Sequence, residues 1–140
     1  MSKPILRVTA ADVKDGVYIG TTSVDGFDGS LEVDADLGWV RFEGSIRVTG
    51  YVIAKAGWGI NAGEGIEAGE GIEAGWGIEA GEGIKAGWGI MAGWGIKAGS
   101  GINAGWGIEA GSGIKAGWGI NAGSGIKAGE GIEAGEGIEA

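Results

Sequence analysis

The stretch KAGWGIMAGWGIKAGSGI, residues 85–102, states one six-residue unit three times. The unit is A-G-x-G-I-x, and its third position holds Trp88, then Trp94, then Ser100. The unit runs without a gap from Ala56 to Glu139, in fourteen copies. A close-packed interior does not accept Trp, Ser and Glu interchangeably. The third position therefore faces solvent, while the invariant Ala and Ile face a core.

A six-residue period with this much glycine indicates extended structure. The apolar positions of an amphipathic helix recur at three and four residues, and each glycine would cost a helix about 1 kcal/mol. In a strand, side chains alternate between the two faces, so Ile60 and Ala62 point one way and Asn61 the other. We predict a strand of about three residues in each unit and a corner at Gly-x-Gly, whose glycines take backbone angles closed to other residues.

Strands and corners in regular alternation predict a parallel β-solenoid. Three units per turn make a triangular coil of about 18 residues, and two make a flat coil of about 12. At the spacing of the triangular coil, the outward position after Ile brings together the opposite charges Glu67–Lys85, Glu79–Lys97, Glu109–Lys127 and Lys115–Glu133, with Lys97–Lys115 as the one like pair. At the spacing of the flat coil, like and opposite pairs balance. This pattern favours the triangle, with three chains wound around one axis as an alternative.

The six-residue spacing of apolar residues begins before the regular repeat. Apolar pairs recur at Leu31/Val33, Leu37/Trp39, Ile46/Val48 and Val52/Ala54. We predict one continuous domain with an N-terminal cap at 1–30, degenerate β-helix coils at 31–55 and regular coils at 56–140. In the cap we expect strands at Ile5–Thr9 and Gly16–Thr21 and a turn at Asp25–Gly29.

The repeat resembles the hexapeptide-repeat left-handed β-helices. Their unit has an aliphatic residue, often followed by glycine, and a small residue four places on. Here Ala occupies the aliphatic place and Ile the small one, which leaves the handedness of the coil open. Residues 44–57, GSIRVTGYVIAKAG, also resemble bactofilins, which are polymerising right-handed β-helices. Both resemblances imply an all-β, single-chain parallel β-helix.

The sequence offers little catalytic chemistry. Hexapeptide-repeat proteins are often acyltransferases or zinc carbonic anhydrases, which use histidine as a base or metal ligand, and this chain has no histidine and no cysteine. We therefore predict no enzymatic activity, no metal and no cofactor. Four carboxylates lie close together in the sequence, at Asp25, Asp28, Asp34 and Asp36. They lack EF-hand spacing, and we interpret them as a turn and a solvated strand face.

Net charge and the N-terminal sequence limit the expected partners and location of the protein. A net charge of −9 disfavours nucleic acid and anionic membranes, which bind proteins mainly through Lys and Arg. The N-terminal residues MSKPILRVTA lack the apolar core of a secretion signal. We expect a cytoplasmic protein.

The tryptophans are the residues that say most about function. Six tryptophans occupy the variable corner position: Trp58, Trp76, Trp88, Trp94, Trp106 and Trp118. Exposed aromatic residues in such number are typical of an interaction surface, although rings stacked between coils could instead brace the corners. We predict a structural protein that associates with itself as a homodimer or larger oligomer. The alternative is a binding module whose tryptophans recognise a carbohydrate or a protein ligand.

Overall fold

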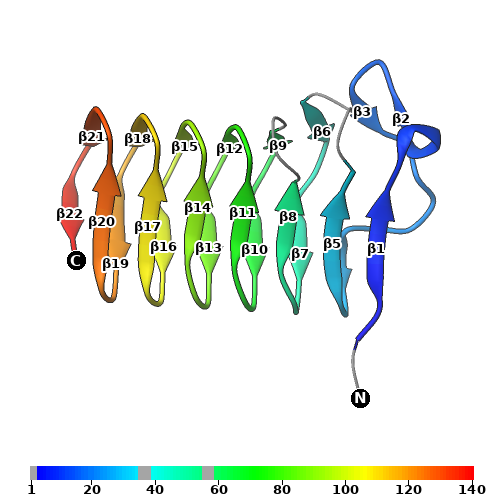
Figure 1. Ribbon diagram of the computed structural model, residues 1–140, viewed down its shortest axis with the longest axis horizontal. Helices are drawn as coiled ribbons and strands as arrows, with labels where there is room; N and C mark the ends of the chain where they lie inside the picture. The colour runs from blue at the N-terminus through cyan, green and yellow to red at the C-terminus, as the bar shows by residue number, and fades with distance from the viewer. Residues whose placement is uncertain (1–2, 35–38, 55–58) are drawn as a thin grey trace.

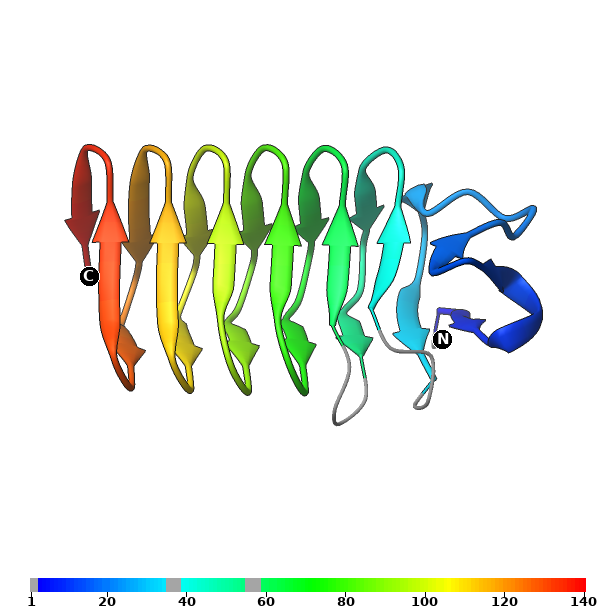
Figure 2. The same cartoon turned by 90° about the horizontal axis from the view of Figure 1, so that it is seen from above.

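The computed structural model describes residues 3–34, 39–54 and 59–140 and folds them into a triangular β-solenoid. The coils stack along one axis, with the two ends of the chain at opposite ends of the stack (Figures 1 and 2). Each coil contributes one strand to each of three sheets, except that the first coil contributes two, β2 and β3, to the same sheet. The fold is all-β apart from one short 3-10 turn, η1 (Ala10–Asp12), and the described residues include no helix long and apolar enough to cross a membrane.

The three sheets are called A, B and C, and their strands are given in spatial order. Sheet A has seven strands: β1 (Ile5–Val8), β5 (Ser30–Val33), β8 (Val52–Ala54), β11 (Ile72–Ala74), β14 (Ile90–Ala92), β17 (Gly107–Ala110) and β20 (Gly125–Ala128). Sheet B has eight: β2 (Val13–Lys14), β3 (Val17–Tyr18), β6 (Val40–Phe42), β9 (Ile60–Ala62), β12 (Ile78–Ala80), β15 (Ile96–Ala98), β18 (Gly113–Ala116) and β21 (Gly131–Ala134). Sheet C has seven: β4 (Asp25–Phe27), β7 (Ile46–Val48), β10 (Ile66–Ala68), β13 (Ile84–Ala86), β16 (Ile102–Ala104), β19 (Gly119–Ala122) and β22 (Gly137–Glu139).

The strand register confirms the triangular coil of three units. Ile66 pairs with Ile84, and Ile84 pairs with Ile102, so each isoleucine lies beside the one three units further along the chain. The corners stack with the same spacing, since the Trp94 N–H donates to the Trp76 carbonyl oxygen at 2.7 Å. The flat coil of two units is thereby excluded.

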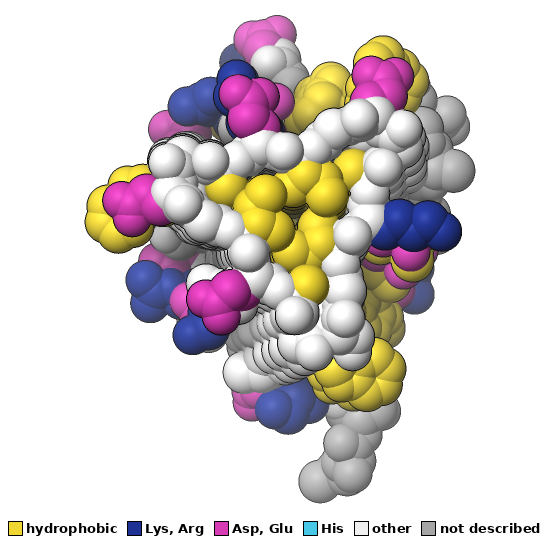
Figure 3. Space-filling model, turned by 90° about the vertical axis from the view of Figure 1, so that its left-hand side faces the viewer, with side chains coloured by type: hydrophobic (Ala, Val, Ile, Leu, Met, Phe, Trp, Pro, Cys, Tyr) yellow, Lys and Arg dark blue, Asp and Glu magenta, His cyan; other side chains and the backbone are white. Residues whose placement is uncertain are grey.

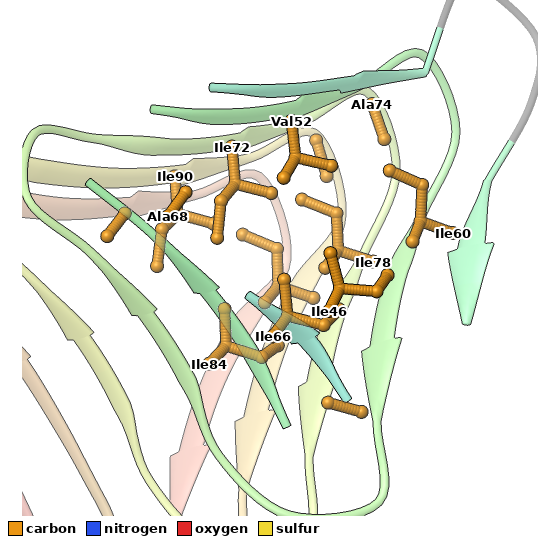
Figure 4. Close-up of a cluster of buried hydrophobic side chains, with 14 of the residues drawn as sticks. Ile46, Val52, Ile60, Ile66, Ala68, Ile72, Ala74, Ile78, Ile84 and Ile90 are labelled. Carbon is orange, nitrogen blue, oxygen red and sulfur yellow. The ribbon is translucent and has the colours of Figure 1, made fainter. Parts of the chain in front are cut away.

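Isoleucine and alanine fill the interior, as the alternation predicts. Every repeat isoleucine from Ile60 to Ile120 is at most 2% exposed, and the alanine two residues after each is also buried. In Figure 4 the isoleucine side chains of successive coils lie against one another inside the triangle. Seen along the axis from the C-terminal end, apolar side chains occupy the centre and charged ones project outward (Figure 3). Burial of each isoleucine contributes about 1.5–3 kcal/mol.

The repeat glycines serve close packing, so the predicted reason for them is wrong. Among the glycines that the structure describes, positive φ angles occur only at Gly16 and Gly26, outside the repeat. A Cβ atom on Gly99 would instead overlap the carbonyl oxygen of Gly81 in the preceding coil. On Gly101 it would lie 3.4 Å from the carbonyl oxygen of Gly119 in the next coil. The first glycine of a corner is therefore required by the spacing between coils, and the second is under weaker constraint.

The register differs from the prediction where the early coils are longer. Val40 pairs with Ile60, which lies further along the chain than three units would reach, and Val40 and Phe42 are the buried pair of β6. Trp39 is 42% exposed, so its predicted inward orientation is wrong, and Leu37 lies outside the described residues. Counting six residues on from Leu31 and Val33 reaches a position an odd number of residues before the pair that is buried, Val40 and Phe42. A shift by an odd number of residues exchanges the two faces of a strand.

The N-terminal residues join the same sheets. The predicted strand at Ile5–Thr9 is present as β1, which pairs in parallel with β5. The strand predicted at Gly16–Thr21 is confined to β3, which forms a hairpin with β2. The turn predicted at Asp25–Gly29 is wrong over Asp25–Phe27, because these residues form β4 and pair with β7.

Candidate functional site

The three corners of the triangle stack into three edges, and each tryptophan belongs to one of them. The chain passes from sheet A to B to C and back to A. We call the edges AB, BC and CA after the sheets that they join. Edge AB carries Trp39, Trp76 and Trp94, edge CA carries Trp88 and Trp106, and edge BC carries Trp118. Trp58 lies outside the described residues.

Edge AB holds a compact aromatic cluster. The rings of Trp76 and Trp94 have their centroids 4.5 Å apart with planes tilted by 42°, as expected for residues one coil apart. Trp39 lies against the glycine backbone, since a Cβ on Gly77 would come within 2.9 Å of its ring. All three tryptophans are exposed. Beside them, sheet B has a shallow hollow of about 330 Å³, lined among others by Glu79, Lys97 and Lys115.

Edge CA holds a second pair in a different geometry. The rings of Trp88 and Trp106 are 6.1 Å apart and nearly parallel, at 15°. A groove of about 720 Å³ runs from them over the outer face of sheet A. Its lining combines apolar side chains with carboxylates: Tyr51, Ile53, Met91, Glu70, Glu73 and Glu109. Trp118, on edge BC, is 65% exposed, and no other described aromatic ring stacks on it.

The structure groups the described corner tryptophans as the predicted coil of three units requires. Trp76 and Trp94 come together, as do Trp88 and Trp106, and Trp118 stands apart. Sequence reasoning missed Trp39, because the longer early coil hides its register. It also missed the groove on sheet A, although the signal was present: Met91 is the one apolar residue at the outward position of the regular repeat.

Two of the four carboxylates near the N-terminus, those of Asp25 and Asp28, have side-chain partners within the chain. Lys3 Nζ lies 2.8 Å from Asp28 Oδ1, and this hydrogen bond, with one from Thr49, lowers the pKa of Asp28. Arg47 Nε lies 3.6 Å from Asp25 Oδ1. Across residues 3–34, 39–54 and 59–140, no three His, Cys, Asp or Glu side chains are grouped so as to hold a metal ion. Asp36, named above with this acidic run, is not among the described residues.

Glu32 is the centre of the other polar cluster. Its carboxylate accepts hydrogen bonds from the Tyr51 hydroxyl at 2.8 Å and from Arg7 Nη1 at 3.2 Å. The bond to this carboxylate raises the pKa of Tyr51 above its usual value, because ionising the hydroxyl would break it and place two negative charges together. The cluster ties sheet A together across the first coils, since Arg7, Glu32 and Tyr51 belong to successive turns.

The chain matches no known protein family, no curated protein and no solved structure. Its surfaces offer two kinds of contact. The aromatic pairs provide flat apolar area for stacking, and the outward columns of sheets B and C provide charges of both signs on strands about 4.8 Å apart.

The ring pairs should be visible by circular dichroism in solution. Two indole rings as close as those of Trp76 and Trp94 couple their electronic transitions, which produces a paired positive and negative band in the ultraviolet. We expect Trp94→Leu to reduce the amplitude of this band and the matched variant Trp118→Leu to leave it nearly unchanged. Equal loss in the two variants, at unchanged melting temperature, would contradict the placement of Trp94 against Trp76.

Proposed function

We propose that this protein is a non-enzymatic structural β-solenoid that associates with itself through edge AB. The observation that carries the proposal is the cluster of Trp39, Trp76 and Trp94, exposed together beside a hollow on sheet B. Solvent-exposed aromatic clusters are costly on a monomer, and tryptophan is enriched among the residues that dominate the energy of protein interfaces. A second copy of the chain would cover them.

Two features of the sequence support this proposal. Residues 44–57 resemble the polymerising bactofilins, and this resemblance implies self-association as a use of the fold. The net charge of −9 disfavours nucleic acid and anionic membranes as competing partners. The cytoplasm is the location we propose.

Edge CA favours a second candidate function, the binding of a carbohydrate. The nearly parallel rings of Trp88 and Trp106 offer two stacking faces for sugar rings. Glu70, Glu73 and Glu109 along the same groove could accept hydrogen bonds from sugar hydroxyls. Titration with a panel of oligosaccharides, followed by tryptophan fluorescence, should give a saturable change that Trp88→Ser with Trp106→Ser abolishes and Trp118→Ser does not.

Self-association is tested by removing one edge at a time. We expect the mass of the wild-type protein to fall on dilution, and the double variant Trp76→Ser, Trp94→Ser to be monomeric at concentrations where the wild type is not. A central interface tryptophan contributes about 2 kcal/mol or more, so its loss weakens association by about 30-fold. Analytical ultracentrifugation over a dilution series measures this.

Trp118→Ser is the matched control, because it makes the same chemical change on a different edge. It should associate like the wild type. A wild-type mass of 13.9 kDa at every concentration would overturn the proposal. So would a double variant on edge AB that associates as tightly as the wild type.

A further inference from the structure

We infer that two copies of this chain associate face to face through sheet B, with their coil axes antiparallel. The twofold axis passes between β12 and β15, which lie side by side (Figure 1), and runs along the direction of the strands. This inference rests on the proposed self-association and assigns it a face, an orientation and a register.

The outward column of sheet B carries the inference. On β6, β12 and β15 the middle residue points outward while its two neighbours are inside, and the outward residues of neighbouring strands pair in register. In spatial order the column reads Arg41, Asn61, Glu79, Lys97, Lys115 and Glu133. Written as charges it is plus, neutral, minus, plus, plus, minus.

This column is complementary to its own reverse. Turned about an axis between Glu79 and Lys97, it places Glu79 opposite the partner's Lys97 and Arg41 opposite the partner's Glu133. Asn61 then faces the partner's Lys115. Each contact occurs twice by symmetry, as in any twofold interface. Every charged residue except Lys115 therefore meets an opposite charge, and no like charges are opposed.

Other registers of the same face are disfavoured by charge. An axis through Lys97 sets that residue against its own copy, and an axis through Glu79 does the same there while opposing Arg41 to the partner's Lys115. Parallel coils would oppose every charge to itself. Like charges brought together at an interface are costly, so the antiparallel register through the Glu79–Lys97 step is the one that the column selects.

The same axis brings the tryptophans together. A twofold axis along the strands keeps each edge on its own side of the interface, so the AB edges of the two copies meet. Trp76 then faces the partner's Trp94 beside the hollow that Glu79 and Lys97 line. On edge BC, at the other side of sheet B, Glu82 faces the partner's Ser100, so no two carboxylates meet at this contact.

Sheet B also has an electrostatic reason to take a partner that sheet C lacks. On sheet C, Glu67 lies between Arg47 and Lys85, so neighbouring coils already neutralise one another. On sheet B, Lys97 and Lys115 are neighbours in register, a repulsion within the monomer. In the dimer the partner's Glu79 lies opposite Lys97 and one coil from the position opposite Lys115, which relieves it.

Charge exchange between Glu79 and Lys97 tests the inference. Glu79→Lys and Lys97→Glu should each weaken the homodimer by about tenfold or more, because each opposes like charges at two symmetric contacts. The double variant should dimerise like the wild type, and an equimolar mixture of the two single variants should form a mixed dimer. The control pair Glu67→Lys and Lys85→Glu makes the same charge changes on sheet C and should leave the dimer intact.

Sedimentation equilibrium separates the outcomes, with melting temperatures confirming that each variant is folded. A wild type that is monomeric at every concentration overturns the proposed self-association and this inference with it. A wild type that associates, with single variants equally dimeric, leaves self-association standing and removes sheet B as its surface. Single variants that dissociate, with a double variant that does not recover, overturn the antiparallel register.

Discussion

Replacing Ile102 with aspartate is expected to unfold the protein, whereas the same replacement at Asn103, the next residue, leaves it folded. Ile102 is fully buried between Ile84 and Ile120 of the neighbouring coils. The change removes about 1.5–3 kcal/mol of apolar burial and leaves an unpaired carboxylate inside, which costs several kcal/mol more. Together these approach the whole stability of a typical domain, about 5–15 kcal/mol.

Disruption of one coil also destabilises the coils next to it. Each coil is stabilised only by the coils on either side, so a broken coil in the middle of the stack exposes the inward faces of both neighbours. Thermal melts followed by far-ultraviolet circular dichroism should show little cooperative β structure for Ile102→Asp. At Asn103 the side chain is exposed and pairs in register with Lys85, so Asn103→Asp adds an opposite charge beside a lysine. Similar melts for the two variants would contradict the assignment of inside and outside.

A single methyl group at the first glycine of a corner should also be strongly destabilising. The Cβ of Gly99→Ala would overlap the carbonyl oxygen of Gly81, and relief requires the coils to move apart. That movement strains two backbone hydrogen bonds, from the Gly99 N–H to the Ala80 carbonyl oxygen at 3.1 Å and from the Ser100 N–H to the Glu82 carbonyl oxygen at 2.9 Å. We expect a loss of about 2–3 kcal/mol, at the upper end of ordinary point substitutions.

Gly101→Ala is the matched control, two residues away in the same corner. Its Cβ would lie 3.4 Å from the Gly119 carbonyl oxygen, so a shift of a few tenths of an ångström accommodates it. Alanine also reduces the conformational entropy of the unfolded chain, which favours folding by about 0.4–1 kcal/mol. We expect a net change near zero in urea unfolding. Equal losses at the two positions would show that backbone angles, not the spacing of coils, select glycine.

The regular coils are predictable from the sequence because one repeat unit corresponds to one side of the triangle. One unit holds one strand and one corner, three such units close a triangle, and Ile102, Asn103 and Ala104 then fall inside, outside and inside. Trp76 and Trp94 are three units apart in the sequence, as are Trp88 and Trp106, so the same arithmetic predicts each pair to be adjacent, and the structure confirms both.

What the sequence could not supply depends on distances between coils or on coils of irregular length. The predicted orientation of Trp39 is wrong because its coil, which runs from Leu31 to the paired residue Val52, is longer than three units, and no repeat before it sets the count. The reason for Gly99 was missed because its constraint comes from Gly81 in the preceding coil, and local backbone preferences carry no trace of it. The grouping of Trp39 with Trp76 and Trp94 needed both pieces of information.

The near-identity of the six-residue units has a consequence for how such a gene can change. Loss or gain of three units would remove or add a whole coil and leave every later side chain on its original sheet. Loss or gain of a single unit would keep the isoleucine interior continuous but rotate all later positions by one side of the triangle. Trp94, for example, would pass from edge AB to another edge. Slippage during replication would therefore rearrange the outer surface of every later coil while conserving the fold.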